Sequence, residues 1–277
     1  MREILRSTKS SAHAKRKHRT RGLLRLALDR MRLLARIRRR RLDAVLVPAP
    51  TPQARRLAAR LGAARILEAP EAHGVHEVER CFALGREFGV AGAPGPLEVF
   101  PDPAAIERVR ARIGEGPFVA VHISARRRRQ RWPLERYAAL ARELARAQPV
   151  MLLWSPGASD EPRHPGDDAA AREVARLAAC DALIPLPTPD LATLVAALSL
   201  ARYVVCPDGG AMHLAAALRK PVVALFGDSP PERWHPWGVD YRIVRPPSHD
   251  LADLPLEPVL AAVREIQTTI APCRRSR

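Results

Sequence analysis

The sequence predicts an α/β fold made of two lobes. From residue 42 onwards, short apolar runs typical of buried strands alternate with longer segments of helical periodicity. The chain has 277 residues, 47% of them hydrophobic, which is enough for one large core or two smaller ones. A stretch rich in proline and glycine at residues 91–103 favours a division into two lobes.

The first 41 residues differ from the rest of the chain in charge. They hold 16 of the 46 Lys and Arg residues and only two of the 29 acidic residues, so they carry +14 of the net +17. Residues 1–20 are polar and basic, which is typical of disorder. In residues 21–41, apolar side chains recur at helical spacing between arginines, which predicts a basic amphipathic helix. Such a helix would lie on anionic lipid headgroups, or its apolar stripe would cover the next strand.

The first lobe is expected at residues 42–115 and the second at residues 116–267, followed by a basic tail at 268–277. In the first lobe, short strands are predicted at residues 43–48 and 64–67, and helices at 52–61, 75–88 and 103–113. In the second lobe, strands are predicted at residues 118–123, 150–154, 183–184, 203–206 and 222–226, with helices at 134–146, 168–179, 191–200 and 211–218. This alternation predicts a doubly wound, Rossmann-like parallel sheet whose ligands bind beyond the carboxyl ends of its strands.

The strongest candidate site is the segment 207–213, which follows a predicted strand. Asp208 is placed to cap the next helix, and the two glycines after it let the backbone approach a ligand whose phosphates bind N–H groups at the helix start. A plain strand-to-helix turn is the alternative, but a second glycine turn at Gly227 favours a binding site. The residues concerned are Asp208, Gly209, Gly210, Ala211, Met212 and His213.

Two further loops follow predicted strands. Ser124 and five arginines, at positions 126–129 and 131, supply a hydroxyl and bidentate donors for a diphosphate. The alternative is a solvated arginine run in a gene of GC-biased composition. In the other loop, Asp160 or Glu161 could accept hydrogen bonds from a ribose, although loop carboxylates are more often only solvated.

The composition disfavours several other classes of protein. The four cysteines lie far apart and form no Cys/His cluster with metal-ligand spacing, so we expect no disulfide framework, no metal site and a reducing cytoplasm. No apolar run approaches the roughly 20 residues that span a bilayer. A nucleic-acid-binding role for residues 1–41 is an alternative, but the other 236 residues carry only +3 and aromatic residues are only 4%.

The three loops together resemble glycosyltransferase family 9, the heptosyltransferases. The resemblance extends over residues 42–265 and is specific over residues 118–238. The matching pieces are Trp132-Pro133, the D-x-G-x-x-H pattern of Asp208 to His213, the run from Pro221 to Gly227, and Pro236-Trp-Gly238.

This resemblance implies a GT-B fold of two Rossmann-like lobes. It also implies an enzyme that transfers a sugar with inversion of its anomeric centre and that needs no metal ion or cofactor. The C-terminal lobe would hold a nucleotide-sugar, typically ADP-heptose, and the N-terminal lobe a lipid-linked glycan acceptor of the lipopolysaccharide core. Carried over to this chain, Asp208 to His213 would surround the sugar and diphosphate, and Asp160 or Glu161 would contact the nucleoside. Phosphate would be held by Ser124, Arg129, Gln130 and Arg131, with Gln130 standing where the family has a lysine.

The N-terminal region departs from the family pattern. The family begins with a buried strand and a Gly-Asp loop that supplies the catalytic base, and this chain has a basic segment there, so we expect an incomplete N-terminal lobe and assign no base. His76 and Glu77 resemble the family's helix near the acceptor cleft. The sequence leaves open an active transferase at the cytoplasmic face of the inner membrane, or a truncated or degenerate relative that binds the donor without efficient transfer.

Overall fold

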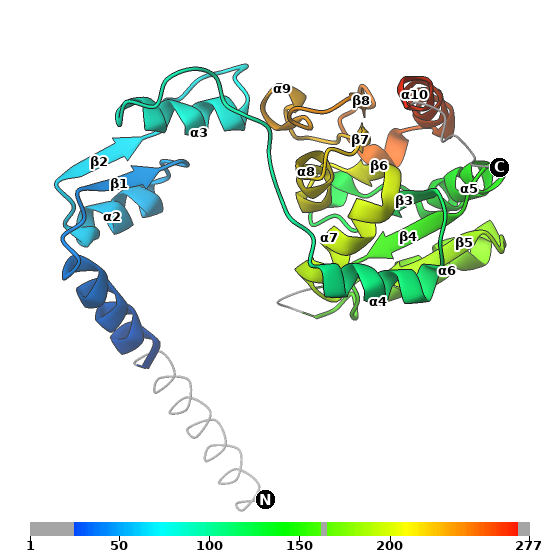
Figure 1. Cartoon of the computed structure of the whole chain (residues 1–277), viewed down its shortest axis with the longest axis horizontal. Helices are drawn as coiled ribbons and strands as arrows, with labels where there is room; N and C mark the ends of the chain where they lie inside the picture. The colour runs from blue at the N-terminus through cyan, green and yellow to red at the C-terminus, as the bar shows by residue number, and fades with distance from the viewer. Residues whose placement is uncertain (1–24, 162–164, 271–277) are drawn as a thin grey trace, which may run out of the picture. The chain divides into compact units, whose positions relative to one another are not determined.

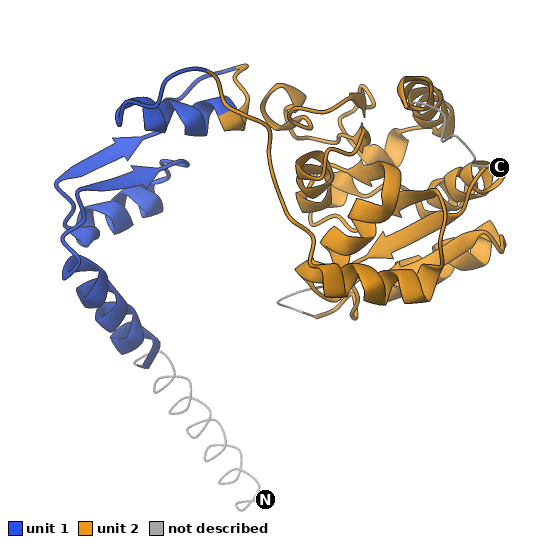
Figure 2. Cartoon of the chain, viewed as in Figure 1, with its two compact units in different colours: residues 1–73, 79–92 blue, residues 74–78, 93–277 orange. Residues whose placement is uncertain are grey.

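The computed structural model describes residues 25–161 and 165–270, and these residues form the predicted α/β fold (Figure 1). They divide into two compact units (Figure 2). Unit 1 contains the described residues up to His73 together with Glu79–Gly92, and unit 2 contains Gly74–Val78 and the described residues from Ala93 onwards. The predicted disorder of residues 1–20 lies outside the described residues.

Unit 1 contains a helix over residues 25–38, two strands, a helix between the strands and most of a helix that follows them. Strand β1 (Ala44–Val47) pairs in parallel with β2 (Arg65–Glu68), with Val45 opposite Ile66. Helix α2 (Pro52–Leu61) connects them, and α3 (Glu77–Arg86) begins in unit 2 and continues in unit 1. The described part of unit 1 thus has a two-stranded sheet, and the incompleteness of the lobe stays a prediction.

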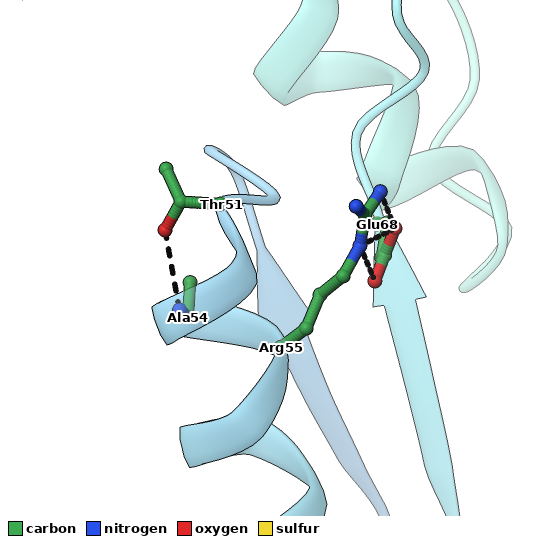
Figure 3. Close-up of polar contacts among 4 residues, drawn as sticks. All are labelled: Thr51, Ala54, Arg55 and Glu68. Carbon is green, nitrogen blue, oxygen red and sulfur yellow. Dashed lines mark hydrogen bonds and ion pairs between the residues drawn. The ribbon is translucent and has the colours of Figure 1, made fainter.

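Local polar contacts define where α2 begins and how it is held. The Thr51 hydroxyl accepts a hydrogen bond from the Ala54 N–H (3.2 Å), and Gly62 ends the helix in the left-handed conformation (φ 69°). Arg55 reaches from α2 to β2, where its Nε donates to Glu68 Oε1 at 2.9 Å and its Nη2 to Oε2 at 2.8 Å (Figure 3). This bidentate pair lowers the pKa of the Glu68 carboxyl.

Unit 2 is built on a six-stranded, fully parallel sheet in the order β5-β4-β3-β6-β7-β8. Five of its strands match predicted ones, and β8 was not predicted. Its strands are β3 (Phe118–His122), β4 (Val150–Trp154), β5 (Leu183–Pro187), β6 (Ala201–Pro207), β7 (Val222–Leu225) and β8 (Tyr241–Val244).

Helices cover both faces of this sheet, so it has a core on each side. The helices are α4 (Pro103–Ile113), α5 (Leu134–Ala145), α6 (Asp168–Ala178), α7 (Leu191–Leu200), α8 (Gly210–Ala217), α9 (Pro231–Trp234) and α10 (Leu256–Thr269). Val119 and Val121 of β3 face the core formed with α5, α6 and α10. Phe118 and Ala120 face the core formed with α4, α7 and α8. This alternation explains why the first four residues of β3, Phe118 to Val121, are an uninterrupted apolar run in the sequence.

The compact units do not follow the predicted lobes, because residues 74–78 and 93–115, predicted in the first lobe, belong to unit 2. Helix α4 belongs to unit 2, because Ala105, Val109 and Ile113 lie on one face of it and pack into the sheet core against α7. The sequence alone predicts these residues in the first lobe, because the proline-rich stretch precedes them without an apolar strand in between. Residues 268 and 269, predicted to begin the basic tail, are the last turn of α10.

The basic amphipathic helix predicted at residues 21–41 is helical over residues 25–38. Leu34 and Ile37 are partly covered, whereas its other large apolar side chains are exposed. In the described ranges no helix combines the length and the apolar character needed to cross a bilayer.

Candidate functional site

In the parallel sheet of unit 2, the order in which strands are added reverses between β3 and β6. From β3 the chain builds outward through β4 to β5, and it then returns to the other side of β3 and continues from β6 through β7 to β8. The loops after β3 and β6 therefore leave the sheet in opposite directions and open a crevice between them. In doubly wound sheets this switch point is where ligands bind.

A buried glutamine joins three loops at this switch point. Gln130 lies in a short 3₁₀ turn after β3, and its side-chain amide donates to Asp208 Oδ2 and to Ser229 Oγ, both at 3.0 Å. Asp208 follows β6 and Ser229 follows β7, and all three residues are buried. Both hydrogens of one amide are thus used to hold the loops after β3, β6 and β7 in a single arrangement.

Gly227 permits two of these loops to cross. A Cβ atom at Gly227 would collide with the carbonyl oxygen of Arg129, and the carbonyl of Gly227 itself accepts a hydrogen bond from Arg245 Nε at 3.1 Å. The second glycine turn noticed in the sequence therefore serves the packing of the arginine loop.

The glycines after β6 stand in open space. A Cβ atom at Gly209 or Gly210 would meet nothing within 4 Å. Helix α8 begins at Gly210 without a side-chain cap, so the prediction that Asp208 caps this helix was wrong. The reason is that the Asp208 carboxylate is instead bound to Gln130. The first N–H groups of α8, which have no acceptor within the helix, lie beside this open space.

Two neighbouring cavities lie along this edge of the sheet. The switch-point cavity, of about 660 Å³, is lined by Ser124, Ala125, Arg126, Arg127, Gln130, Asp208, Gly209, Gly210, Ser229, Pro230, Arg233 and Trp234. The Asp167 cavity, of about 590 Å³, is lined by Ser124, Ala125, Arg126, Arg131, Ser155, Pro165 and Asp167. The two cavities share Ser124, Ala125 and Arg126, and the Ser124 hydroxyl accepts a hydrogen bond from the Ser155 N–H (2.9 Å) between them.

The two cavities differ in charge. The switch-point cavity has three guanidinium groups, of Arg126, Arg127 and Arg233, and one carboxylate in its lining. Glu77 and Asp228, which pair with Arg233 and Arg127, offset part of this positive charge, and the lining with Arg126 still favours an anion. In the Asp167 cavity, Arg131 Nη1 lies 3.4 Å from the buried Asp167 carboxylate, and Arg131 Nε donates to the Ala125 carbonyl at 3.1 Å. A buried carboxylate with neighbouring hydroxyl groups suits a polar ligand that offers hydrogen-bond donors.

Two histidines near the site favour the neutral form. Burial lowers the pKa of His213, and the nearby Asp208 carboxylate opposes this effect. His122, at the end of β3, is buried, and burial lowers its pKa to about 4. Its Nδ1 atom is buried without a hydrogen-bond partner. Both imidazoles are therefore neutral at pH 7.

The structure brings together some of the predicted site residues and leaves others apart. Ser124, Gln130, Asp208, Gly209 and Gly210 line the switch-point cavity, and Arg131 lines the neighbouring one. His213 packs edge-on against Trp234 of the cavity wall, at 6.2 Å between ring centroids. The predicted donor-site residues that line neither cavity are His213, Arg129, Asp160 and Glu161, of which the last three are exposed, and Ala211 and Met212, which are buried beneath the turn.

Several lining residues were not predicted. Asp167 lies at the start of α6, just beyond the loop that carries Asp160, and its place after a predicted loop was a usable signal. Ser229 follows the second glycine turn by two residues. Arg233 and Trp234 come from α9, a four-residue helix that has no periodic pattern to predict it.

His76 and Glu77, predicted near an acceptor, contact the loop that follows α9. His76 Nδ1 accepts from the Val78 N–H (3.1 Å), so Nε2 carries the proton and donates to the His235 carbonyl at 2.9 Å. The imidazole stacks on Trp237, with ring centroids 4.6 Å apart. Glu77 Oε2 accepts from Arg233 Nε at 2.8 Å, which connects residue 77 to a wall of the switch-point cavity. Across the described parts of the chain, no three His, Cys, Asp or Glu side chains gather as a metal site.

Comparison with known proteins identifies a family and two curated relatives that this chain resembles. The chain matches glycosyltransferase family 9 (heptosyltransferase) over residues 54–256. Lipopolysaccharide heptosyltransferase 2 of Escherichia coli (strain K12) is 28% identical over 182 residues, which are 61% of this chain and 50% of that protein. The protein of the same name from Salmonella typhimurium gives the same figures. The chain thus spans about half the length of the curated relatives it matches.

Solved structures share the fold at low identity. The glycosyltransferase family 9 protein of Veillonella parvula DSM 2008 has a TM-score of 0.72 at 16% identity, over 85% of this chain and 78% of that chain. The E. coli heptosyltransferase WaaC with ADP has a TM-score of 0.66 at 20% identity, over 87% and 78%. E. coli ADP-heptose lps heptosyltransferase II gives 0.65 at 22%, over 87% and 81%. These likenesses confirm the predicted GT-B-like class of fold.

The region matched by the family includes both glycine turns, the arginine loop and the two cavities between them. It also covers most of the described chain. The resemblance inferred from the loops is therefore confirmed, and the chain belongs to glycosyltransferase family 9, the heptosyltransferase family.

Proposed function

We propose that unit 2 binds a nucleoside-diphosphate sugar, as the donor-binding part of a transferase that adds heptose to a lipopolysaccharide core or a related envelope glycan. One observation carries this proposal: the switch-point cavity combines three guanidinium groups with an uncapped helix start beside two glycines that neither packing nor contacts require. The diphosphate would bind the N–H groups of α8 and the arginines, because both are built to hold negative charge.

The nucleoside would occupy the Asp167 cavity. Its buried carboxylate would accept hydrogen bonds from ribose hydroxyls, a role that the sequence had given to Asp160 or Glu161. ADP-heptose is the donor that we propose. Support comes from relatives of the same fold that are described with ADP and with ADP-2-deoxy-2-fluoro heptose.

The proposed reaction is an inverting transfer. An acceptor hydroxyl attacks the anomeric carbon, the bond from that carbon to the diphosphate breaks, and the negative charge moves to the leaving diphosphate. Arg126, Arg127 and the start of α8 would stabilise that charge in the transition state. The hydroxyl proton must pass to a base, and we assign that role to no residue of this chain. His76 and Glu77 remain candidate contacts of the acceptor.

Calorimetric titration of the full chain with ADP-heptose, ADP, and GDP- and UDP-sugars tests the donor site. We expect saturable binding of ADP-heptose that is lost in a variant carrying Asp208→Ala and His213→Ala. Arg126→Ala and Arg128→Ala form a matched pair within one loop, because both remove one arginine but only Arg126 lines the cavities. A loss of one charge-assisted hydrogen bond of about 1.5–3 kcal/mol predicts roughly 10- to 150-fold weaker binding for Arg126→Ala alone.

Equal losses for Arg126→Ala and Arg128→Ala would show that only the charge of the loop matters, and would contradict the cavity assignment. Absence of donor binding by the folded protein would refute the proposal altogether. A second measurement distinguishes an active transferase from a relative that only binds its donor. It follows ADP release on adding a heptose-deficient lipopolysaccharide acceptor: release that depends on the acceptor indicates transfer, and binding without release indicates the degenerate relative.

A further inference from the structure

The helix over residues 25–38 exposes an unusual amount of apolar surface. The exposed fractions are 66% for Leu26, 47% for Leu28, 59% for Met31 and 56% for Leu33. These are four of the eleven exposed large apolar residues in the described part of the chain, and all lie within eight consecutive positions. Single exposed apolar residues are ordinary on a protein surface, whereas a contiguous group marks a contact surface.

Three arginines of the same helix share one face. At about 100° per residue, Arg25, Arg32 and Arg36 fall along one line of the helix, which we call the arginine ridge. The exposed leucines and Met31 fall on both sides of this ridge and extend toward the opposite face. Asp29 is the acidic residue on the ridge side, where it lies 3.6 Å from Arg32. Arg30 and Arg38 lie away from this ridge, and apart from them and Asp29 every helix position off the ridge is apolar.

Figure 1 shows this helix at one end of unit 1, before β1 and α2. Only its final turn has partly covered apolar residues, Leu34 and Ile37, and there Arg38 lies against Gly62, within 3.3 Å of where a Cβ would stand. The exposed apolar residues all precede that turn. The free part of the helix thus carries both features, the ridge and the apolar surface.

We propose that residues 25–41 bind the surface of an anionic lipid bilayer, with the helix in the plane of the interface. Its apolar side chains would enter the boundary between headgroups and acyl chains, and the ridge and Arg39 to Arg41 would contact lipid phosphates. The described helical residues, 25–38, extend about 21 Å, which is shorter than the hydrocarbon core of a bilayer. This inference goes beyond the proposed function and rests on unit 1 alone.

Charge complementarity together with apolar exposure favours a bilayer over a nucleic acid. A nucleic acid would neutralise the arginines but would leave Leu26, Leu28, Met31 and Leu33 in water. An anionic bilayer satisfies both kinds of side chain at once. The two partners therefore differ in whether the apolar residues contribute to binding, which is a measurable difference.

The test is cosedimentation of the full chain with sucrose-loaded vesicles of phosphatidylcholine and phosphatidylglycerol (3:1), compared with phosphatidylcholine alone. An apolar variant replaces Leu26, Leu28, Met31 and Leu33 with glutamine, and a ridge variant carries Arg25→Gln, Arg32→Gln and Arg36→Gln. A control variant removes the same charge from exposed helix positions of unit 2, by Arg112→Gln, Arg142→Gln and Arg172→Gln. Because all these side chains are exposed, circular dichroism and thermal melting should show folded proteins.

We expect the wild type and the control variant to bind the anionic vesicles, and both helix variants to bind at least about tenfold more weakly. Three outcomes would overturn the proposal. The wild type could fail to bind, the control variant could lose as much as the ridge variant, or the apolar variant could bind as well as the wild type. In the last case, a ridge-dependent shift of a 20-nucleotide RNA that the apolar variant retains would identify a nucleic-acid surface instead.

Discussion

Replacing Gly210 with alanine should change donor binding and the free energy of unfolding in different ways. It is the first residue of α8 and lines the switch-point cavity, yet a Cβ atom there would meet nothing within 4 Å. It is also absent from the glycines with left-handed backbone conformation. Neither its own backbone nor its packing therefore requires glycine, and an alanine side chain would project into the space assigned to the donor.

The expected magnitudes follow from these two facts. Replacing glycine with alanine at a compatible helical position raises the free energy of unfolding by about 0.4–1 kcal/mol. The added methyl group would keep a phosphate from the N–H groups at the helix start. Loss of one charge-assisted hydrogen bond costs about 1.5–3 kcal/mol, so the dissociation constant of ADP-heptose should rise roughly 10- to 150-fold.

Urea denaturation and calorimetric titration of Gly210→Ala measure the two effects on one protein. We expect a slightly more stable protein that binds ADP-heptose poorly. Wild-type affinity in Gly210→Ala would refute the placement of the diphosphate at α8. A loss of stability of more than about 1 kcal/mol would instead show that the space beside Gly210 is filled by protein.

The other predictions concern stability. Gly227→Ala should lower the free energy of unfolding by about 1–3 kcal/mol in urea denaturation, because the new Cβ collides with the Arg129 carbonyl, and an unchanged urea midpoint would contradict this crossing. Burial lowers the pKa of His122 to about 4 from 6.5, so the unfolded chain binds the proton first and stability falls as the pH drops through this window. The loss from this group should be about 2.5 kcal/mol between pH 7.5 and 4.5, and His122→Asn should remove that part of the slope. Leu152→Ala, in the centre of β4, should cost about 2–5 kcal/mol in the same assay, and a cost below 1 kcal/mol would contradict its burial.

Much of the sheet could be predicted because its central strands are buried on both faces. β4 is apolar throughout and β3 is apolar up to His122, and such runs flanked by loops have few other interpretations. β8 has an arginine within four residues and lies at the sheet edge, so its pattern is too short to distinguish from a loop. The lobe assigned to α4 depended on where its apolar face packs, which is tertiary information.

The site was predictable in its loops but not in its individual side chains. Fold topology alone brings the ends of β3 and β6 together, so the loops holding Gln130 and Asp208 could be paired from the sequence. The choice of Asp208 as a helix cap failed because a distant amide, 78 residues away in the chain, competes for its carboxylate. Asp160 and Asp167 lie in the same loop region, and only the path of that loop determines which of them lines a cavity.

Residues 74–78 belong to unit 2 although unit 1 precedes and follows them in the chain, so the two units cannot be separated by cutting the chain once. Cleavage after Gly92 would place His76 and Glu77 on one fragment and their partners, Trp237 and Arg233, on the other. Limited proteolysis near residue 92 should therefore leave two fragments that stay associated, or a C-terminal fragment whose cavity wall at Arg233 has loosened. We therefore expect that unit 2 can be expressed alone in its native form only if the fragment includes residues 74–78.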